Sequence, residues 1–570
     1  MSSLALLALG FLALLVVGYR VYGRFVARQF ALDDSRPTPA RELEDGVDYV
    51  PTRRGYLFAQ HFSAIAAAGP IAGPILACME FGWLPCLLWI GLGVVFIGAV
   101  HDFSSLAASL RHGGRSVAEI AREHLGRPAG RAMMGFIWIA LIYVIIAFAD
   151  ITAGTFHSGT EELRELGAGF NPGGAVAAAS AMYLALSVAM GLVQRWLKPP
   201  LWLVTLIFVP ATFGVAWLGT RVSGLLMLDH KTWALLILGY CAVASVVPVW
   251  ALLQPRGYLG GFVLYSALAL GVIGILFGGY SIEQPAFKGW SGAATGSLLF
   301  PFLFVTIACG ACSGFHGLVC SGTTSKQVAR ETDARLIGFG GMLAEGFVAL
   351  IALVTIMIVA QGDLIGADGR ALGPGTIYGN GIGRFLTLLI GEERLAFAVT
   401  FGAMAFSTFV FDTLDVCTRL GRYMIQELCG WRTRAGAWAG TLITIALPVL
   451  VLSAGEAGSW KMFWILFGAS NQLLAALTLI AITVWLRRTG RRSAFVFLPM
   501  LFVLGITLWA LGTLLVADLR AAEGFDVHLA NGLAASVLVL LALFLAGQAL
   551  LRGRRALPPP RPGLPLEPGR

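Results

Sequence analysis

The stretch HFSAIAAAGPIAGPILA, residues 61–77, is apolar but contains two Gly-Pro pairs, Gly69-Pro70 and Gly73-Pro74. Each proline lacks an amide hydrogen and clashes with a carbonyl one turn earlier, and glycine permits backbone conformations that other residues avoid. We therefore expect a kinked or unwound helix at these pairs. Inside a bilayer, such a backbone is tolerated only where it is buried or lines a cavity.

The expected break covers residues 66–75 and has two interpretations. Half-helix N-termini attract anions and free carbonyls attract cations, so a broken helix near the bilayer midplane is typical of a transporter binding site. The alternative is a proline kink that serves packing alone. We favour the binding site, with backbone amides near Ala72–Ile75 and Ser313–His316 as candidate anion donors.

The composition is that of a membrane protein. Of the 570 residues, 57% are hydrophobic and 12% are charged, whereas about 25% charged residues is usual for soluble domains. Apolar runs near the ~20 residues needed to cross a bilayer predict an all-α polytopic integral membrane protein with roughly fifteen transmembrane helices. The expected spans are 4–19, 57–79, 83–106, 132–154, 175–193, 201–219, 232–253, 258–280, 297–320, 336–360, 397–418, 437–455, 461–486, 494–517 and 531–551.

Charge placement predicts the orientation. If the N-terminus lies outside, most of the 40 Lys and Arg fall in cytoplasmic loops, so the positive-inside rule favours N-out and C-in. The net charge of +9 then reflects topology and contact with anionic lipids, without nucleic acid. The oligomeric state stays open.

Four regions follow from this map. Residues 1–28 form a peripheral N-terminal transmembrane helix that is retained, because no basic residue precedes it and no cleavage site follows it. Residues 29–56 form a cytoplasmic segment, and 57–551 form the core with extra C-terminal helices. Residues 552–570 are a Pro-rich, disordered cytoplasmic tail. The long loop 361–396 is a candidate re-entrant segment.

Polar residues within apolar spans indicate function, because ionisable groups in a bilayer are costly. Those that we expect to bind substrate are His61, Ser63, Gly69, Pro70, Gly73, Pro74, Ser313, Gly314 and His316. The candidates for ion coupling are Asp102, Ser407, Thr408 and Asp412. A proton carrier needs a carboxyl away from basic neighbours, which favours Asp102 and Asp412, whereas the two hydroxyls with carbonyls of 69–74 suit sodium.

Several polar groups have structural alternatives. His61, His101 and His316 are either satisfied core histidines or a bound-metal site. Asp415 and Arg419 stand four residues apart and suit an ion pair. Glu345 also lies in an apolar span, and Asn471 and Gln472 can hydrogen-bond between helices. The CGAC motif at 309–312 is one isolated cysteine pair, so we interpret it as close helix packing rather than zinc binding.

Six blocks carry a family resemblance: DYVPTRRGYLFAQHFSAIAAAGPIAGPILA, GAVHDF, ASVVPVWALLQPRGYL, LFPFLFVTIACGACSGFHGLVCSGTTSKQ, FDTLDVCTRLGRY and FWILFGASNQLLAAL. Together they resemble the signature blocks of the carbon starvation protein A (CstA) family across residues 48–478. One departure is Gln60, where the family often has a second histidine. The resemblance implies a bacterial inner-membrane transporter for pyruvate or peptides under nutrient limitation, with proton coupling for the pyruvate carriers.

The resemblance also implies the amino acid–polyamine–organocation superfamily, whose core is two inverted five-helix repeats. If 57–79 opens the first repeat, the second opens either at 232–253, which contains Pro248, or at the glycine-rich 297–320. We favour the first of these.

Three function classes compete. A secondary active transporter importing a small organic nutrient, with a proton or sodium ion and no other cofactor, agrees best with these features. An intramembrane metalloenzyme using the three histidines is the alternative, although no H-E-x-x-H motif occurs. A sensor or channel is third. An ATP-driven pump is excluded, since the chain contains no G-x-x-x-x-G-K-[ST] motif.

Overall fold

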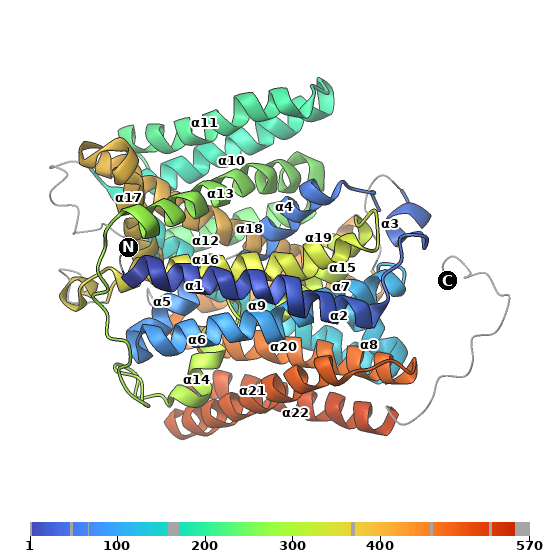
Figure 1. The fold of residues 1–570 in the computed structure, drawn as a ribbon. Coiled ribbons are helices and arrows are strands. Elements are labelled where there is room, and N and C mark those ends of the chain that lie inside the picture. The colour runs from blue at the N-terminus through green and yellow to red at the C-terminus, as the bar shows by residue number, and fades with distance from the viewer. Residues whose placement is uncertain are drawn as a thin grey trace.

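The computed structural model describes residues 3–45, 49–66, 68–157, 170–365, 371–431, 433–455, 460–523 and 527–552. These residues form helices and loops, with isolated β-bridges and no extended strand. The axes of most long helices lie roughly along one common line, so the molecule is a single helical bundle (Figure 1). The all-α prediction is confirmed, while the predicted tail from residue 553 onward lies outside the described residues.

The α-helices are α1 (Ser3–Val17), α2 (Gly23–Phe30), α3 (Pro39–Glu42), α4 (Arg54–Ile65), α5 (Gly69–Phe81), α6 (Trp83–Gly93), α7 (Ala99–Arg111), α8 (Val117–Leu125), α9 (Arg127–His157), α10 (Pro172–Trp196), α11 (Leu201–Arg221), α12 (His230–Val246), α13 (Leu253–Phe277), α14 (Leu299–Thr306), α15 (Gly314–Gly322), α16 (Gly341–Met357), α17 (Pro374–Ile390), α18 (Leu395–Cys429), α19 (Arg434–Ala454), α20 (Trp460–Arg488), α21 (Ala494–Ala521) and α22 (Val527–Arg552). Three π-helical turns join neighbours: η1 (Gly18–Tyr22), η2 (Val94–Gly98) and η6 (Arg335–Gly340).

In the described part of the chain, 12 continuous helical runs are long and apolar enough to cross a membrane, and a bent pair raises the number to 13. The bent pair, α4 and α5, covers the predicted span 57–79. The remaining two predicted spans are shorter: α12 has 17 residues, and 297–320 is divided between α14 and α15. The exact number of membrane crossings and the N-out orientation stay predictions.

The first break lies slightly earlier than the Gly-Pro pairs predict. Helix α4 ends at Ile65, α5 begins at Gly69, and the two are bent by 44°. Pro70 lies in the first turn of α5, where a missing amide hydrogen costs nothing. The amide of Ala72 donates to Ala68 O at 2.8 Å, so helical hydrogen bonding has already begun there. The prediction of a break is confirmed, but unwinding through residue 75 is wrong.

The glycines of α5 permit close contact with a second broken element. A Cβ on Gly69 would lie 2.3 Å from Cys309 Sγ, and a Cβ on Gly73 would lie 2.6 Å from Thr306 O. Both partners belong to the end of α14 and the non-helical segment before α15. The two breaks therefore lie against each other. Of the two candidate starts for a second repeat, 297–320 is the one with this arrangement.

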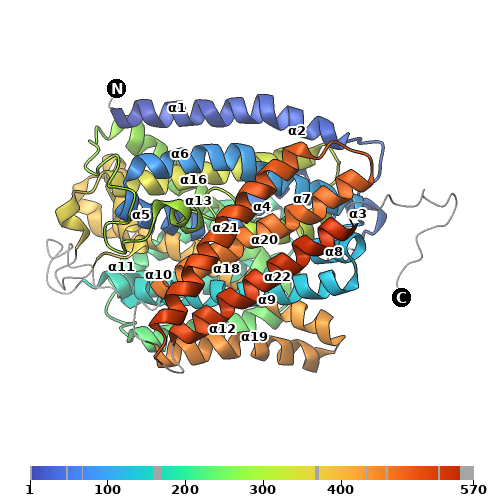
Figure 2. The ribbon, with the colours of Figure 1, turned by 90° about the horizontal axis from the view of Figure 1, so that it is seen from below.

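Burial separates the centre of the bundle from its periphery. The most apolar window of the run containing α20 is 94% buried, whereas that of α11 is 22% buried. Helix α1 lies along one edge of the bundle, and α21 and α22 cross its outer face (Figure 2). The predicted peripheral position of the N-terminal helix agrees with this view.

Two features were not resolved by the sequence patterns. The loop 361–396 contains a 17-residue helix, α17, which packs against α18 and α16. Two π-helical turns, η2 and η6, directly precede α7 and α16. Such turns are rare and often occur at functional sites, and α7 and α16 carry the buried charges described next.

Candidate functional site

A continuous row of ionisable side chains, here called the histidine–carboxylate chain, consists of His101, Asp102, His316 and Glu345. Asp102 Oδ1 lies 2.7 Å from His101 Nδ1, and its Oδ2 lies 2.8 Å from His316 Nδ1. The other ring nitrogen of His316, Nε2, lies 3.0 Å from Glu345 Oε2. All four side chains are at most 1% exposed. The chain therefore links α7, α15 and α16 through polar contacts in an otherwise apolar interior.

The breaks position this chain. His61 belongs to the last turns of α4, directly before the first break, and His316 belongs to the first turn of α15, directly after the second. His61 Nδ1 contacts Thr324 Oγ1 at 2.9 Å, and its Nε2 has no hydrogen-bond partner. A Cβ on Gly341 would lie 3.0 Å from His61 Cδ2, so this glycine makes room for the imidazole.

The N-terminus of α15 is already occupied by a side chain. Asn471 Oδ1 accepts from the Phe315 amide at 2.8 Å, and a Cβ on Gly314 would lie 2.3 Å from Asn471 O. Ser313 Oγ also lies within hydrogen-bond distance of the Asn471 side chain. The predicted anion donors at Ser313–His316 are thus used in part by α20 in this conformation. Asn471, expected to hydrogen-bond between helices, does so here.

A second buried group, here called the arginine cluster, consists of Arg256, Tyr240, Asp412 and Asp415. The Arg256 guanidinium donates to Asp415 and to the Tyr240 hydroxyl, and its Nε lies 3.2 Å from Asp412 Oδ1. Tyr240 in turn donates to Asp415 Oδ2 at 2.8 Å. The guanidinium also stacks over the Phe411 ring at 5.2 Å. One cation is therefore shared between two carboxylates.

Arg256 is a buried charged residue that sequence reasoning missed. The topology map placed it in a cytoplasmic loop at 254–257, whereas the structure leaves it 1% exposed at the start of α13. The signal was Pro248, which lies in the break between α12 and α13, together with Pro255 in the first turn of α13, next to the arginine. A Cβ on Gly260 would lie 2.9 Å from Asp412 Oδ2, so this glycine allows the carboxylate to approach.

The predicted ion pair between Asp415 and Arg419 is wrong. Arg419 instead donates to the carbonyls of Ala244 and Val247, at 2.7 and 2.8 Å. These carbonyls belong to the C-terminal end of α12, where backbone acceptors lack helical donors. Asp415 is consequently free to pair with Arg256.

The two candidate sodium ligands differ: the Ser407 hydroxyl has hydrogen-bond partners, whereas the Thr408 hydroxyl is buried without one. Ser407 Oγ donates to Met404 O at 3.0 Å and lies 3.0 Å from Ser180 Oγ. The Thr408 carbonyl lies 3.5 Å from a guanidinium nitrogen of Arg256. A fixed cation beside this carbonyl disfavours a second cation there. Ser63, on α4, contacts the carbonyl of Gly257 at 3.4 Å and so connects α4 to α13, the helix that carries Arg256.

The structure does not bring the predicted metal ligands together. Both ring nitrogens of His316 contact carboxylates, while His101 contacts Asp102 and His61 contacts Thr324. Among the described residues, the group of His, Cys, Asp or Glu with mutually close ligand atoms is a different one: His112, Glu123 and His124. The cysteines of the CGAC motif are free and buried, as expected for packing.

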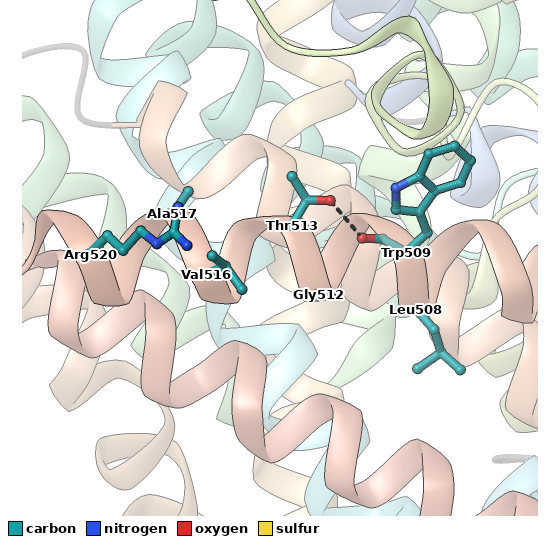
Figure 3. Close-up of a pocket in the computed structure, with 7 residues that line it drawn as sticks. All are labelled: Leu508, Trp509, Gly512, Thr513, Val516, Ala517 and Arg520. Carbon is teal, nitrogen blue, oxygen red and sulfur yellow. Dashed lines mark hydrogen bonds between the residues drawn. The ribbon is translucent and has the colours of Figure 1, made fainter.

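A surface hollow of about 580 Å³ lies far along the outer helix α21 (Figure 3). Its lining comes from that helix alone: Leu508, Trp509, Gly512, Thr513, Val516, Ala517 and Arg520. It contains none of the buried ionisable groups.

A polytopic helical bundle in which two broken helices meet beside buried charges has the architecture of a secondary transporter. A family model described as "Carbon starvation protein CstA" matches residues 2–368 and 367–510, and the chain belongs to this family.

The curated relatives agree with this assignment. The chain is 34% identical over 578 residues to "Peptide transporter CstA" of Mycobacterium tuberculosis, covering 87% of this chain and 73% of the relative. It is 31% identical over 598 residues to "Pyruvate/proton symporter BtsT" of Escherichia coli, covering 90% and 81%. A manganese transporter of Eremococcus coleocola aligns with 90% of this chain and 99% of that chain, at 12% identity and a TM-score of 0.43.

The relatives are bacterial transporters, and the chain is a multi-pass protein of the bacterial inner membrane.

Proposed function

We propose that this protein is a proton-coupled importer of a small organic nutrient, either a pyruvate-like monocarboxylate or a short peptide. The observation that carries the proposal is the histidine–carboxylate chain at the meeting point of the two breaks. The names of the relatives support both cargo classes, since one is a peptide transporter and another a pyruvate/proton symporter.

Coupling requires a cation whose binding differs between the outward and inward states. In the chain, Glu345 has a single polar contact, to His316, and its Oε1 has no hydrogen-bond partner. A proton on this carboxyl removes a buried charge that little else compensates. Asp102, by contrast, is held by two imidazoles. We assign proton loading to Glu345 and His316, with Asp102 orienting the imidazole.

This assignment modifies the sequence-based one. Asp102 remains in the coupling chain, but Asp412 faces Arg256 and shares this cation with Asp415. We assign the arginine cluster to conformational coupling, because one guanidinium that bridges two carboxylates can shift its pairing when α13 and α18 move. Sodium coupling through Ser407 and Thr408 is disfavoured by the same guanidinium. The metalloenzyme alternative loses its ligand set, since the three histidines do not converge.

Transport by the purified protein tests the proposal. We expect proteoliposomes with an acidic exterior to accumulate labelled pyruvate or a labelled di- or tripeptide. Accumulation should collapse with a protonophore and should not require sodium. If neither substrate class accumulates or exchanges by counterflow, the proposed function is wrong. If accumulation needs sodium instead of a pH gradient, the cargo class survives and the coupling ion is wrong.

A further inference from the structure

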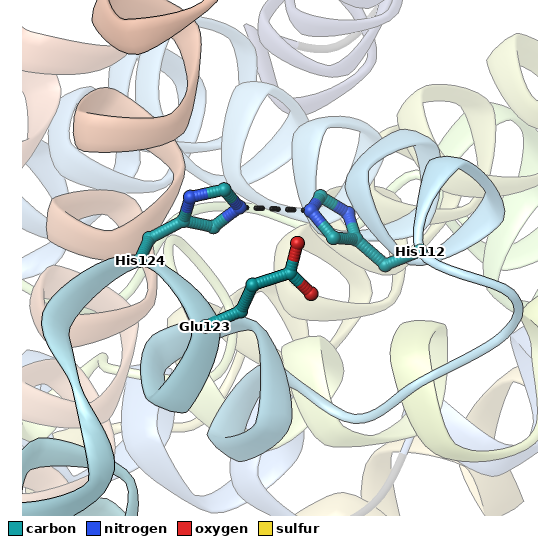
Figure 4. Close-up of side chains that lie close together, drawn as sticks. All are labelled: His112, Glu123 and His124. Carbon is teal, nitrogen blue, oxygen red and sulfur yellow. Dashed lines mark hydrogen bonds between the residues drawn. The ribbon is translucent and has the colours of Figure 1, made fainter. Parts of the chain in front are cut away.

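The cluster of His112, Glu123 and His124 lies away from both sites described above, where the C-terminal end of α7 meets the last turn of α8 (Figure 4). One ligand atom from each residue lies within 4.8 Å of the other two. The two imidazoles face each other, with 2.9 Å between His112 Nε2 and His124 Nε2. The carboxylate of Glu123 points toward the same space (Figure 4).

The hydrogen bonds of the cluster fix the tautomer of His112. His112 Nδ1 lies 2.6 Å from Ala108 O, and because a carbonyl only accepts, this nitrogen carries the proton. The lone pair of His112 Nε2 therefore faces His124 and accepts a hydrogen bond from His124 Nε2. A backbone carbonyl that holds the second ring nitrogen in this way is typical of metal-binding histidines, because it fixes the tautomer.

His124 is suited to the same role. Its side chain is 2% exposed, and Nε2 of its ring faces His112. A neutral imidazole is the form that binds metal. The contact between the two rings is a single N–H···N hydrogen bond, in which His124 Nε2 carries the hydrogen. A cation that binds both Nε2 atoms breaks this bond, and the proton of His124 moves to its Nδ1, which has no hydrogen-bond partner in this structure.

We propose that His112, Glu123 and His124 bind a divalent transition-metal ion of the Zn²⁺ class. Two imidazoles and one carboxylate, with water in the fourth position, form a ligand set that Zn²⁺ accepts. At Zn–N distances of ~2.0–2.1 Å, a tetrahedral site needs about 3.3 Å between the nitrogens. The imidazoles must therefore separate by about 0.4 Å from the distance of 2.9 Å and rotate so that both Nε2 lone pairs point at the ion.

The surroundings allow the ion to enter. The Glu123 side chain is 49% exposed and gives access from solvent. Arg115 lies 3.6 Å from Glu123 Oε2, and this exposed ion pair is displaced on binding at a cost of about 0–1 kcal/mol. Arg488 donates to the carbonyl of His124, so its charge is partly engaged. The metal would connect the C-terminal end of α7 to α8, and α7 also carries His101 and Asp102 in its first turn.

The test uses the purified full-length protein, stripped with a chelator and titrated with Zn²⁺ against a chromogenic competitor. We expect one Zn²⁺ per chain and a rise in unfolding temperature on binding. Glu123→Gln and His112→Gln should each lower the affinity by at least the 10–100-fold that loss of an outer-shell partner costs. His124→Ala should abolish tight binding.

His528 provides the matched control. It pairs with Asp518 at 2.9 Å elsewhere in the molecule, so His528→Ala should bind Zn²⁺ like the wild type. Because His124 is buried and its variant risks misfolding, the exposed Glu123→Gln decides the outcome, and Co²⁺ absorption reports whether nitrogen and oxygen ligands are present. Absence of tight Zn²⁺ binding, or binding unchanged in both Glu123→Gln and His112→Gln, would overturn the proposal.

Discussion

The meeting of the two breaks predicts a strong effect for the smallest substitution at Gly69. The Cβ of Gly69→Ala would lie 2.3 Å from Cys309 Sγ and 2.5 Å from Cys309 Cβ, whereas ordinary contacts begin at 3.4 Å. One segment must therefore move by about 1 Å against packed backbone. Overpacking of this kind costs ~1–3 kcal/mol, and we expect a lower unfolding temperature in detergent together with impaired transport.

A matched glycine separates the clash from the general effect of alanine. At Gly135, in α9, no atom lies within 4 Å of the place that a Cβ would take, and alanine is favoured over glycine in helices by ~0.8–1.0 kcal/mol. Gly135→Ala should therefore leave stability unchanged or raise it. The double variant Gly69→Ala with Cys309→Gly removes both clashing atoms and should recover stability, with a coupling energy of ~0.5–3 kcal/mol.

A Gly69→Ala protein that unfolds and transports like the wild type would contradict this prediction. A double variant Gly69→Ala with Cys309→Gly that is no more stable than Gly69→Ala alone would also contradict it. Either outcome would mean that α5 and the segment before α15 do not lie against each other at these residues.

Three further predictions concern Arg256, Asn471 and Ser407. Arg256→Met should destabilise the protein by about 3–5 kcal/mol because Asp412 and Asp415 remain buried without their cation. Thermal unfolding measures this loss, and a variant as stable as the wild type would contradict the two ion pairs. Asn471→Ala should cost about 1–3 kcal/mol by leaving a buried amide of α15 without its acceptor, and an unchanged unfolding temperature would count against this cap. Ser407→Ala should transport substrate like the wild type in sodium-free buffer. If the variant instead loses an uptake that depends on sodium, the hypothesis of a sodium site at Ser407 would be supported again.

The sequence predicted the class of fold because its signals are local. Apolar runs define spans one at a time, and the Gly-Pro pairs placed the first break within a few residues of Ala66–Ala68. Proline is favoured in the first turn of a helix as well as at breaks, which explains why Gly69-Pro70 lies just inside α5; Pro74 lies further within the same helix. Helix α17 was harder to detect because its sequence, PGTIYGNGIGRFLTLLI, mixes glycine and polar residues with a short apolar end.

The sites could be predicted only in part, because they depend on contacts between distant segments. His61, Asp102 and His316 were identified as unusual for an apolar interior, and they do lie near the breaks. The partner of each charge could not be read from spacing: Arg256 comes to Asp412 from another helix, while Arg419, one turn from Asp415, turns to backbone carbonyls instead. An i, i+4 spacing allows an ion pair but does not exclude a better partner.

Proton coupling through the histidine–carboxylate chain can be tested by comparing pH-driven accumulation with counterflow in proteoliposomes containing Glu345→Gln. Accumulation needs a proton to bind and leave, whereas counterflow needs only exchange of substrate between the two sides. We predict that Glu345→Gln loses accumulation but retains counterflow, while the exposed-site control Glu42→Gln retains both. Accumulation at the wild-type level in Glu345→Gln would contradict proton loading at the histidine–carboxylate chain.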